Sequence, residues 1–291
     1  MSQQPSEKSS QSLGTLYIVP TPIGNLADMT ERAVTILQQV DLIAAEDTRH
    51  SRPLLQQYNV STQVLSVHEH NESSRAGQLI EKLKQGLNIA LISDAGMPLI
   101  SDPGYVIVRE CRAEQIPVVA LPGACAFVTA LAGSGLATDK FMFEGFLPAK
   151  SAARKKAFAH LADQTRSVVF YESPHRIESC LEDLAEILPC RHVVLARELS
   201  KQYETYLSGT ASELLAQMHE DSNQKRGEMV LMIGGVEKET AQDDQISMEQ
   251  QRAVTLLMQH LPLKKAAAVT AELYGGRKNA LYQWAIAQSD D

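Results

Sequence analysis

The segment SDAGMPLISDPG, residues 93–104, combines residue types that suit a ligand site. It places two Asp, two Gly and two Pro directly after residues 88–93, an apolar run typical of a strand covered on both faces. Small residues let a ligand approach the backbone, and the carboxylates of Asp94 or Asp102 can accept hydrogen bonds from hydroxyl or amino groups. A plain turn, with Asp102 capping a helix that begins near Pro103, is the alternative. We favour a site, because ligands of open α/β sheets lie at the carboxyl ends of the strands.

Three further loops follow predicted strands. They are EDTR at 46–49, LPGAC at 121–125 and YESPHR at 171–176. The first two share the first half of the chain with 93–104, whereas 171–176 lies in the second half. If each half forms a domain, these loops converge at a cleft between the domains, where small-ligand pockets are common. The sequence therefore predicts an interdomain binding site.

The segment HEHN at 68–71 offers a second kind of chemistry. His68 and His70, together with Asp47 and Asp94, carry the donor atoms of a metal-dependent hydrolase. However, a His-x-His pair on a loop without placed carboxylates is a weak metal signal, so we expect ordinary polar contacts and no metal. The four cysteines, at 111, 125, 180 and 190, have no C-x-x-C spacing and are predicted to be buried and reduced.

Two common phosphate-binding motifs are absent from the sequence. The loop after the first strand reads PTPIGN, which is not G-x-G-x-x-G, and no G-x-x-x-x-G-K-[ST] occurs. NAD-binding and P-loop functions therefore lose their main support. The net charge of −8 also argues against a protein that coats nucleic acid through bulk positive charge, although local basic clusters remain.

The elements that position these loops alternate between strand and helix. This alternation in the first half predicts a largely parallel sheet with helices on both faces. The second half predicts another α/β domain, in which Ser173 and Pro174 begin a helix. Its expected strands lie at 141–146, 167–172, 192–198 and 228–235. The C-terminal residues predict two or three short helices with a Gly-Gly turn, similar to a helix-turn-helix module.

The predicted organisation has five parts. They are a tail over 1–13, α/β domains over 14–137 and 138–236, an acidic linker over 237–248 and a helical module over 249–291. Residues 116–137 carry no charge but are interrupted by Pro and Gly, so we expect no membrane span. The polar N-terminus lacks the apolar core of a signal peptide, which predicts a cytoplasmic protein.

Several motifs occur in one order over residues 14–235. They are GTLYIVPTPIGNLADMT, IAAEDTRHSRPLL, HEHNE, LISDAGMPLISDPG, LPGACA, FYESPHR and RELSKQYET. Together they resemble the tetrapyrrole-methylase superfamily, and more closely its branch that methylates a ribose 2′-hydroxyl of cytidine in small-subunit ribosomal RNA. The C-terminal module is similar to that branch as well. The SDAG turn stands where porphyrin and corrin methylases usually have G-D-P, which weakens the alternative of a tetrapyrrole precursor as substrate.

The resemblance implies S-adenosylmethionine as methyl donor, bound folded in the cleft between the two α/β domains, and a homodimer as the assembly. Its sulfonium methyl is already activated, so the protein has mainly to align the attacking oxygen and exclude water. The resemblance also implies which residues contact the donor. These are Pro22, Ile23, Ser93, Asp94, Ala95, Met97, Ala124, Cys125 and Tyr171.

The RNA substrate adds two further sets of candidate residues. A ribose hydroxyl is a poor nucleophile near neutral pH, so a proton acceptor would help, and Glu172, Lys201 and His175 are equal candidates. Basic residues are expected to contact phosphates. These are Arg49, Arg52, Arg154, Lys155, Lys264, Lys265, Arg277 and Lys278. A non-catalytic RNA-binding factor is the remaining alternative.

Overall fold

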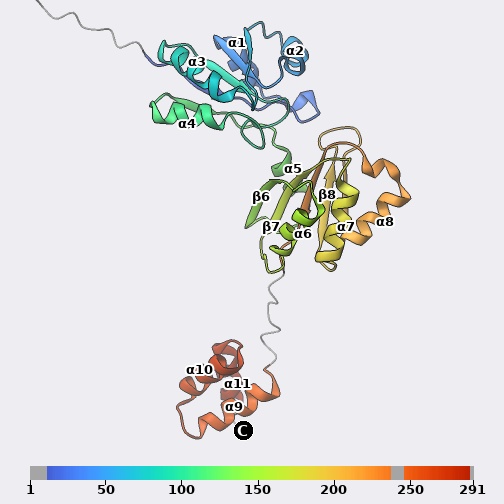
Figure 1. Cartoon of the computed structure of the whole chain (residues 1–291). Coiled ribbons are helices and arrows are strands. Elements are labelled where there is room, and N and C mark those ends of the chain that lie inside the picture. The colour runs from blue at the N-terminus through green and yellow to red at the C-terminus, as the bar shows by residue number, and fades with distance from the viewer. Residues whose placement is uncertain (1–11, 237–245, 289–291) are drawn as a thin grey trace, which may run out of the picture. The chain divides into compact units, whose positions relative to one another are not determined.

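Five parallel strands form the first sheet, as the alternation of strands and helices predicts. The computed structural model describes residues 12–236 and 246–288, and the chain divides between Gly235 and Val236 into two units (Figure 1). The strands of the first sheet are β1 (Leu16–Ile18), β2 (Leu42–Ala45), β3 (Val64–Ser66), β4 (Ile89–Ile92) and β5 (Val118–Ala120). Their order is β3-β2-β4-β1-β5, and every pairing is parallel.

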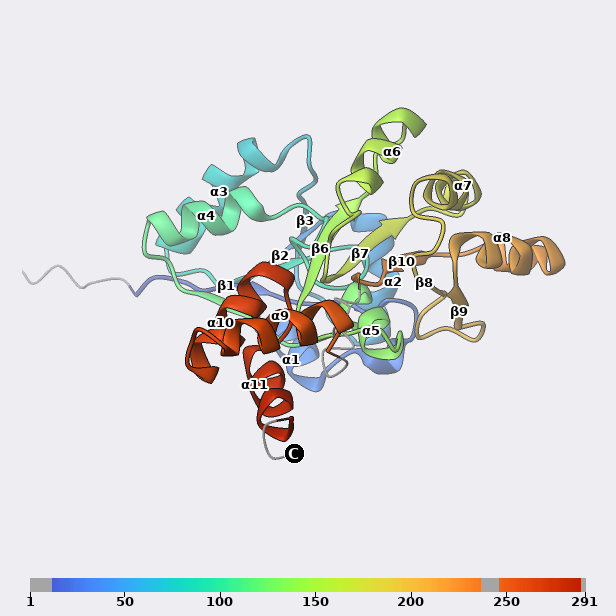
Figure 2. The ribbon, with the colours of Figure 1, turned by 90° about the horizontal axis from the view of Figure 1, so that it is seen from below.

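Helices cover both faces of this sheet because both faces are apolar. Successive side chains of a strand point to opposite faces. Ala44 therefore packs with α3 (Glu72–Lys84) and α4 (Tyr105–Ala113), whereas Ile43 packs with α1 (Glu31–Gln39) and α2 (Thr48–Gln57). Helices α3 and α4 lie side by side in both views of the ribbon (Figure 1, Figure 2).

The loop between β4 and α4 is anchored by a buried carboxylate. Glu72, the first residue of α3, accepts hydrogen bonds from the backbone N–H groups of Gly104 (3.0 Å) and Val106 (2.8 Å). A negative charge is favourable at the start of a helix, where the first N–H groups lack intrahelical partners. Asp102 therefore does not cap α4, and the helix begins at Tyr105 rather than near Pro103.

The second sheet is mixed rather than parallel. Its strands are β6 (Phe141–Phe146), β7 (Ser167–Glu172), β8 (Val193–Arg197), β9 (Thr205–Gly209) and β10 (Met229–Ile233), in the order β6-β7-β10-β8-β9. Only β6 and β7 pair in parallel, and the other pairings are antiparallel. The edge strand β9 was missing from the sequence prediction, because its residues TYLSG alternate only weakly between apolar and polar types.

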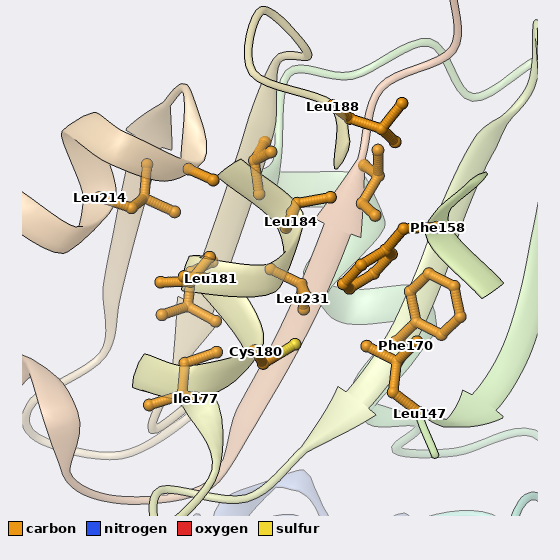
Figure 3. Packing of buried hydrophobic residues seen from close by; sticks show 14 of the residues in the cluster. Leu147, Phe158, Phe170, Ile177, Cys180, Leu181, Leu184, Leu188, Leu214 and Leu231 are labelled. Atoms are coloured by element: carbon orange, nitrogen blue, oxygen red, sulfur yellow. The ribbon is translucent and has the colours of Figure 1, made fainter. Parts of the chain in front are cut away.

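Helices cover the second sheet on both faces as well. α6 (Ser151–Ala159), α7 (Ile177–Ile187) and α8 (Ala211–Glu220) pack on one face, and α5 (Ala126–Gly133) packs on the other. Figure 3 shows the larger of the two cores, where Phe158 of α6 and Cys180 and Leu184 of α7 gather around Leu231 of the central strand β10. The neighbouring Met232 points into the other core.

The start of α7 differs from the prediction. Ser173 and Pro174 do not begin the helix, which starts at Ile177. Instead the carbonyl oxygen of Ser173 accepts hydrogen bonds from the backbone N–H groups of Arg176 (3.0 Å) and Ile177 (3.1 Å). Residues 173–176 therefore form a turn that keeps Ser173 and Pro174 at the carboxyl end of β7.

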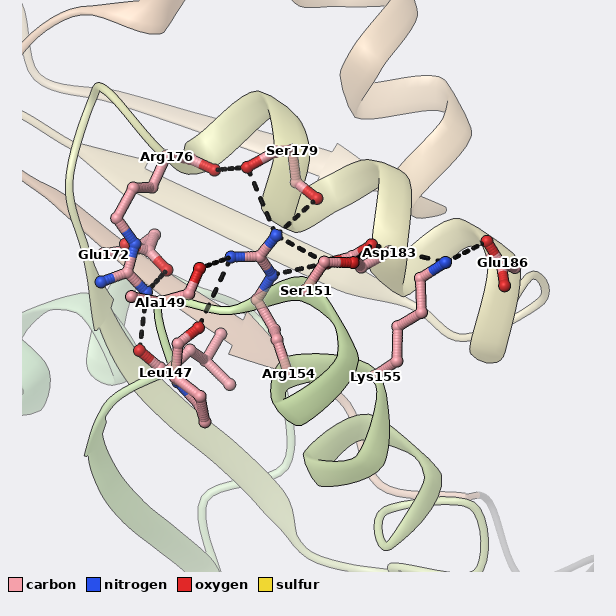
Figure 4. Close-up of polar contacts among 11 residues, drawn as sticks. Leu147, Ala149, Ser151, Arg154, Lys155, Glu172, Arg176, Ser179, Asp183 and Glu186 are labelled. Carbon is pink, nitrogen blue, oxygen red and sulfur yellow. Dashed lines mark hydrogen bonds and ion pairs between the residues drawn. The ribbon is translucent and has the colours of Figure 1, made fainter.

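A buried ion pair ties α6 to α7. The guanidinium of Arg154, which is 2% exposed, lies 2.6 Å from the carboxylate of Asp183, and that carboxylate also accepts a hydrogen bond from Ser151 (2.7 Å) (Figure 4). Further N–H groups of Arg154 donate to the carbonyl oxygens of Ala149 (3.4 Å) and Ser179 (3.2 Å). The prediction that Arg154 contacts RNA is therefore wrong, because its charge is enclosed by partners inside the domain.

The second unit is a three-helix module with a core of its own. Its helices are α9 (Met248–Met258), α10 (Leu263–Tyr274) and α11 (Lys278–Ala287), drawn in orange and red in Figure 2. Val254, Ala266 and Leu281, one from each helix, are buried together. Ser247 caps α9, so this helix begins within the segment predicted as linker, 237–248, of which 237–245 lie outside the described residues.

Two simpler predictions have mixed outcomes. Cys111 and Cys180 are buried as predicted and Cys125 is partly buried, but Cys190 is exposed in the turn between α7 and β8. Residues 116–137 contain β5 and α5, which are a short strand and a short helix. Among residues 12–236 and 246–288, no helix has the length and apolar character needed to cross a membrane.

The buried ion pair gives a testable prediction about stability. Arg154→Met removes the cation that lies 2.6 Å from buried Asp183 and leaves Lys155 at 3.7 Å, so we expect the free energy of unfolding to fall by about 3 kcal/mol and Tm to fall by roughly 6–12 °C. Lys156→Met is the matched control, because Lys156 is an exposed base on the same helix. We expect it to shift Tm by less than about 2 °C. Thermal unfolding followed by circular dichroism measures both, and equal shifts would contradict the prediction.

Candidate functional site

A cavity of about 440 Å³ lies between the two α/β domains of the first unit. Its first wall comes from loops at the carboxyl ends of β1, β2 and β4, which contribute Ile23, Glu46 and most of the residues between Asp94 and Asp102. The opposite wall comes from the ends of β6 and β7 and the start of β10. The convergence of strand-end loops from both halves is therefore confirmed for the loops after β2, β4 and β7.

Five of the nine residues expected to contact a methyl donor line this cavity. They are Ile23, Asp94, Ala95, Met97 and Tyr171. The other four are absent from its lining: Pro22, Ser93 and Cys125 are each next in sequence to a lining residue, and Ala124 packs in the same apolar cluster as Ile23.

Hydrogen bonds fix the loops of the first wall to one another. The backbone N–H of Thr21 donates to the carbonyl oxygen of Gly96, and the N–H of Gly96 donates to the carbonyl oxygen of Thr21, both at 2.9 Å. The buried hydroxyl of Ser93 donates to the same Gly96 oxygen (3.3 Å). Ser93 therefore shapes the turn that carries Asp94, so it supports the cavity without lining it.

Three carboxylates gather on the first wall. Glu46 follows β2, and Asp94 and Asp102 belong to the loop after β4. Burial, followed by the charge of Glu46, raises the pKa of Asp102 to about 6. Burial and the neighbouring charge of Asp94 also raise the pKa of Glu46. The wall therefore favours a bound positive charge, which would relieve the repulsion among these groups.

Glu46 is a lining residue that the sequence analysis did not single out. It lies in the strand-end loop 46–49, but that position alone does not give its side chain a role. The available signal was its position directly after the buried run of β2. Its neighbour Asp47 instead pairs with Arg49 at 2.6 Å, which holds the pKa of Asp47 well below its usual range.

Two aromatic side chains, Phe146 and Tyr171, line the opposite wall and are backed by further rings. The rings of Phe146 and Tyr171 are 5.6 Å apart, and those of Tyr171 and Phe143 are 4.9 Å apart. Phe143 in turn stacks on Phe127 of α5 at 4.5 Å. Burial is the main cause that raises the pKa of Tyr171 to about 12, so its hydroxyl stays protonated at neutral pH. This wall therefore offers flat apolar surface opposite the carboxylates.

The three candidates for proton acceptor have different surroundings. Glu172 lines the cavity, but its carboxylate already accepts hydrogen bonds from the backbone N–H of Ser173 (2.8 Å) and from Arg176 (3.1 Å). His175 is exposed and is not among the lining residues. The structure therefore brings only one of these two side chains to the cavity, and that one is held by partners.

Lys201, the third candidate, connects the two domains instead of lining the cavity. Its ammonium group lies 3.0 Å from Glu198 and 3.1 Å from Glu228. Burial acts to lower the pKa of Lys201, but these two ion pairs outweigh it and raise the pKa, so the group stays charged and is a poor base. Its methylene stem lies against Gly24, where an added Cβ would be 2.5 Å from the Cγ of Lys201.

The remaining residues predicted to contact RNA lie at the surface or close to it. Arg49 and Arg52 are exposed on α2, and Lys155 is paired with Glu186 at 2.5 Å. In the second unit, four basic residues are exposed at the starts of α10 and α11. They are Lys264, Lys265, Arg277 and Lys278.

The alternative of a metal-dependent hydrolase loses its ligand set. In the part of the chain that the structure describes, no three His, Cys, Asp or Glu side chains are grouped so that they could hold a metal ion. The Nε2 atom of His68 lies 3.0 Å from the side-chain amide nitrogen of Asn71. Asp47 pairs with Arg49, as described above.

Solved structures of other proteins share this fold. A diphthine synthase has a TM-score of 0.58 at 12% identity, over 76% of this chain and 90% of that one. A uroporphyrin-III-C-methyltransferase from Thermus thermophilus has a TM-score of 0.54 at 18% identity, over 79% of this chain and 98% of that one. At such low identity these similarities concern the fold alone.

Two family models and several curated relatives match the sequence. Residues 15–215 match the tetrapyrrole (corrin/porphyrin) methylases, and residues 244–289 match the RsmI C-terminal HTH domain. A relative from Haemophilus influenzae named ribosomal RNA small subunit methyltransferase I is 55% identical over 94% of this chain and 97% of its own. A relative of the same name from Escherichia coli O157:H7 is 52% identical over 99% of both chains. The chain therefore belongs to the tetrapyrrole (corrin/porphyrin) methylase family, in the branch whose curated members carry that name.

Proposed function

We propose that this chain transfers the methyl group of S-adenosylmethionine to the ribose 2′-hydroxyl of a cytidine in small-subunit ribosomal RNA. The observation that carries the proposal is the cavity between the two α/β domains, where Ile23, Asp94, Met97 and Tyr171 meet. These residues belong to the motifs that resemble this branch of the family. The two relatives that are 55% and 52% identical to this chain are named as methyltransferases of small-subunit ribosomal RNA.

The residues of the cavity fit the proposed donor. S-Adenosylmethionine supplies a methyl group on a positively charged sulfur, so that an oxygen can attack the methyl carbon as the carbon–sulfur bond breaks. Glu46, Asp94 and Asp102 place negative charge on one wall, where they attract such a cation. Met97 and Tyr171 supply apolar surface that excludes water from the reacting atoms.

Charge also lets the cavity distinguish the donor from the demethylated product. The donor carries one more positive charge than the neutral thioether that remains after transfer. Carboxylates therefore hold the donor more tightly than the product. This difference favours replacement of the product by a new donor molecule after each turnover. Because the pKa of Asp102 is about 6, its contribution to this attraction is complete only above that pH.

The RNA is expected to contact exposed basic residues on both units. Arg49 and Arg52 lie on α2, next to the loop that carries Glu46, whereas Lys264 and Lys278 lie on the C-terminal module.

We also infer that the protein acts in the cytoplasm as a homodimer, as the family resemblance implies. Recognition of the 2′-hydroxyl itself selects RNA over DNA.

A tetrapyrrole precursor is a weaker alternative substrate. The uroporphyrin-III-C-methyltransferase shares the fold at only 18% identity, so this similarity carries no information about the substrate. The SDAG turn of this chain also differs from the G-D-P turn of porphyrin and corrin methylases. A porphyrinogen methylation assay discriminates the two substrates directly.

The first prediction concerns the product. Incubating the protein with labelled donor and small ribosomal subunits from a strain that lacks the gene is expected to place the label on the ribose of one cytidine. Partial alkaline hydrolysis followed by mass spectrometry locates it, because 2′-O-methylation protects the adjacent phosphodiester bond from alkaline cleavage. Label on a base, or no label, would contradict the proposed function.

The second prediction concerns pH. Asp102 is protonated and neutral below about pH 6 and charged above it, so donor affinity should rise as the pH increases through 6 and then level off. We expect a three- to tenfold gain, roughly, between pH 5 and pH 7.5 by calorimetry. Asp102→Asn should flatten this curve, and the neutral product should show a weaker dependence on pH.

A control separates Asp102 from the neighbouring imidazole. The imidazole of His50 lies 3.4 Å from the carboxylate of Asp94 on the same wall. His50→Gln should keep most of the pH dependence of donor affinity. If His50→Gln flattens the curve and Asp102→Asn does not, the assignment to Asp102 is wrong.

The third prediction concerns the C-terminal module. Because the first unit has its own cores, deleting residues 245–291 should leave donor affinity within about twofold of the full chain. Affinity for small subunits should fall about tenfold or more, since exposed basic residues are removed. Calorimetry and filter binding measure the two affinities. Equal losses would mean that the module only stabilises the rest of the protein.

A further inference from the structure

Phe146 is an exposed aromatic residue at the edge of the cavity. It lines the cavity, yet its residue surface is 58% exposed. Other lining residues, such as Ile23 and Met229, are less than a tenth exposed. Large aromatic side chains usually gain stability by burial, so an exposed ring at this position has a face available to something that arrives from solvent.

The backbone of β6 directs Phe146 toward the cavity. β6 pairs in register with β7 up to Phe143, and the register then shifts before Phe146 pairs with Tyr171. Gly145, inside this irregularity, has φ +66°, a conformation that favours glycine. Bulges of this kind redirect side chains and are common next to active sites. The irregularity at Gly145 therefore sets the direction in which Phe146 projects from β6.

Neighbouring rings hold Phe146 in place. Tyr171 meets it edge to face, with an interplanar angle of 61°, and Phe143 meets Tyr171 in the same way at 67°. Phe127 stacks behind Phe143 at an interplanar angle of 20°. A ring supported in this way loses little conformational freedom when a planar ligand stacks on it.

We propose that Phe146 is a stacking surface for the base of the target nucleotide, which rests on the function proposed above. RNA bases that are turned out of a helix or loop are commonly bound by stacking on aromatic side chains. A base held on Phe146 would place its own ribose at the opening of the cavity. The enclosed part of the cavity, near Ile23 and Met229, is left for the donor. Phe146 is thus a positioning residue that acts through binding of the acceptor.

The proposal predicts a change in the affinity for RNA without a change in the affinity for the donor. Phe146→Leu keeps an apolar side chain but removes the aromatic face. We expect the KM for unmodified small subunits to rise about tenfold. kcat and the calorimetric Kd for the donor should stay within about twofold, because stacking of the base contributes equally before and during transfer. Phe146→Trp keeps an aromatic face at this position, so its KM should be close to that of the unaltered chain.

Phe141→Leu is the matched control. Phe141 is the exposed Phe at the other end of β6, and it does not line the cavity. This variant should have the KM of the unaltered chain. Melting curves of all variants establish that each is folded.

Fluorescence gives a second measurement that does not depend on turnover. The chain has one Trp, Trp284, so Trp284→Phe combined with Phe146→Trp places a single reporter at the proposed surface. RNA should quench it, whereas a Trp placed at 141 in the same background should not respond.

The outcomes distinguish failure of the stacking surface from failure of the proposed methyltransferase function. An unchanged KM in Phe146→Leu, or an unquenched Trp at 146, would overturn the stacking surface while methylation by the unaltered chain still stands. A tenfold weaker donor Kd with an unchanged KM would assign the ring to the donor instead. Absence of label with the unaltered chain would overturn the proposed function, and the stacking surface with it.

Discussion

The carboxylate of Glu72 fixes the loop on which one wall of the cavity depends. That loop crosses from β4 to α4 without regular secondary structure, and Leu99 and Ser101 within it have positive φ values of 73° and 64°. Such conformations persist only when the surroundings enforce them. Glu72 is buried, but its two hydrogen bonds at the start of α4 compensate for the loss of water. A residue on α3 thereby anchors the loop that carries Asp94 and Asp102, two of the three carboxylates of that wall.

The two walls of the cavity differ in the forces that they offer a ligand. The first wall is acidic, because Glu46, Asp94 and Asp102 lie at the carboxyl ends of neighbouring parallel strands. The second wall is mainly apolar, because Tyr171, Met229 and Val230 line it beside Glu172 and Glu228. A ligand that combines a positive charge with flat apolar groups satisfies both walls at once, and this combination is what distinguishes the proposed donor from most metabolites.

The elements of the first sheet could be predicted because their residues obey simple periodicities. Both faces of β4 are apolar, so IALI reads as a covered strand. The start of α7 could not be predicted in this way, since Ser173 and Pro174 have the residue types of a helix start but are used in a turn. Arg154 was misplaced for a related reason, because its partner Asp183 is far away in sequence. The position of Glu46 in the cavity likewise depends on tertiary packing that no local pattern encodes.

The contact between Lys201 and Gly24 has a consequence for sequence tolerance and for motion. The stem of the lysine occupies the space that any side chain at position 24 would need, so a larger residue there would act as a wedge between the domains. The same lysine is held by Glu198 and Glu228, and Ser200 beside it donates a hydrogen bond to Asp28. Widening the cavity at this side therefore requires the hydrogen bond of Ser200 to Asp28 and the packing of Lys201 on Gly24 to break together. Phe146 on the lining of the cavity is exposed to solvent, so ligand exchange past it does not require these contacts to break.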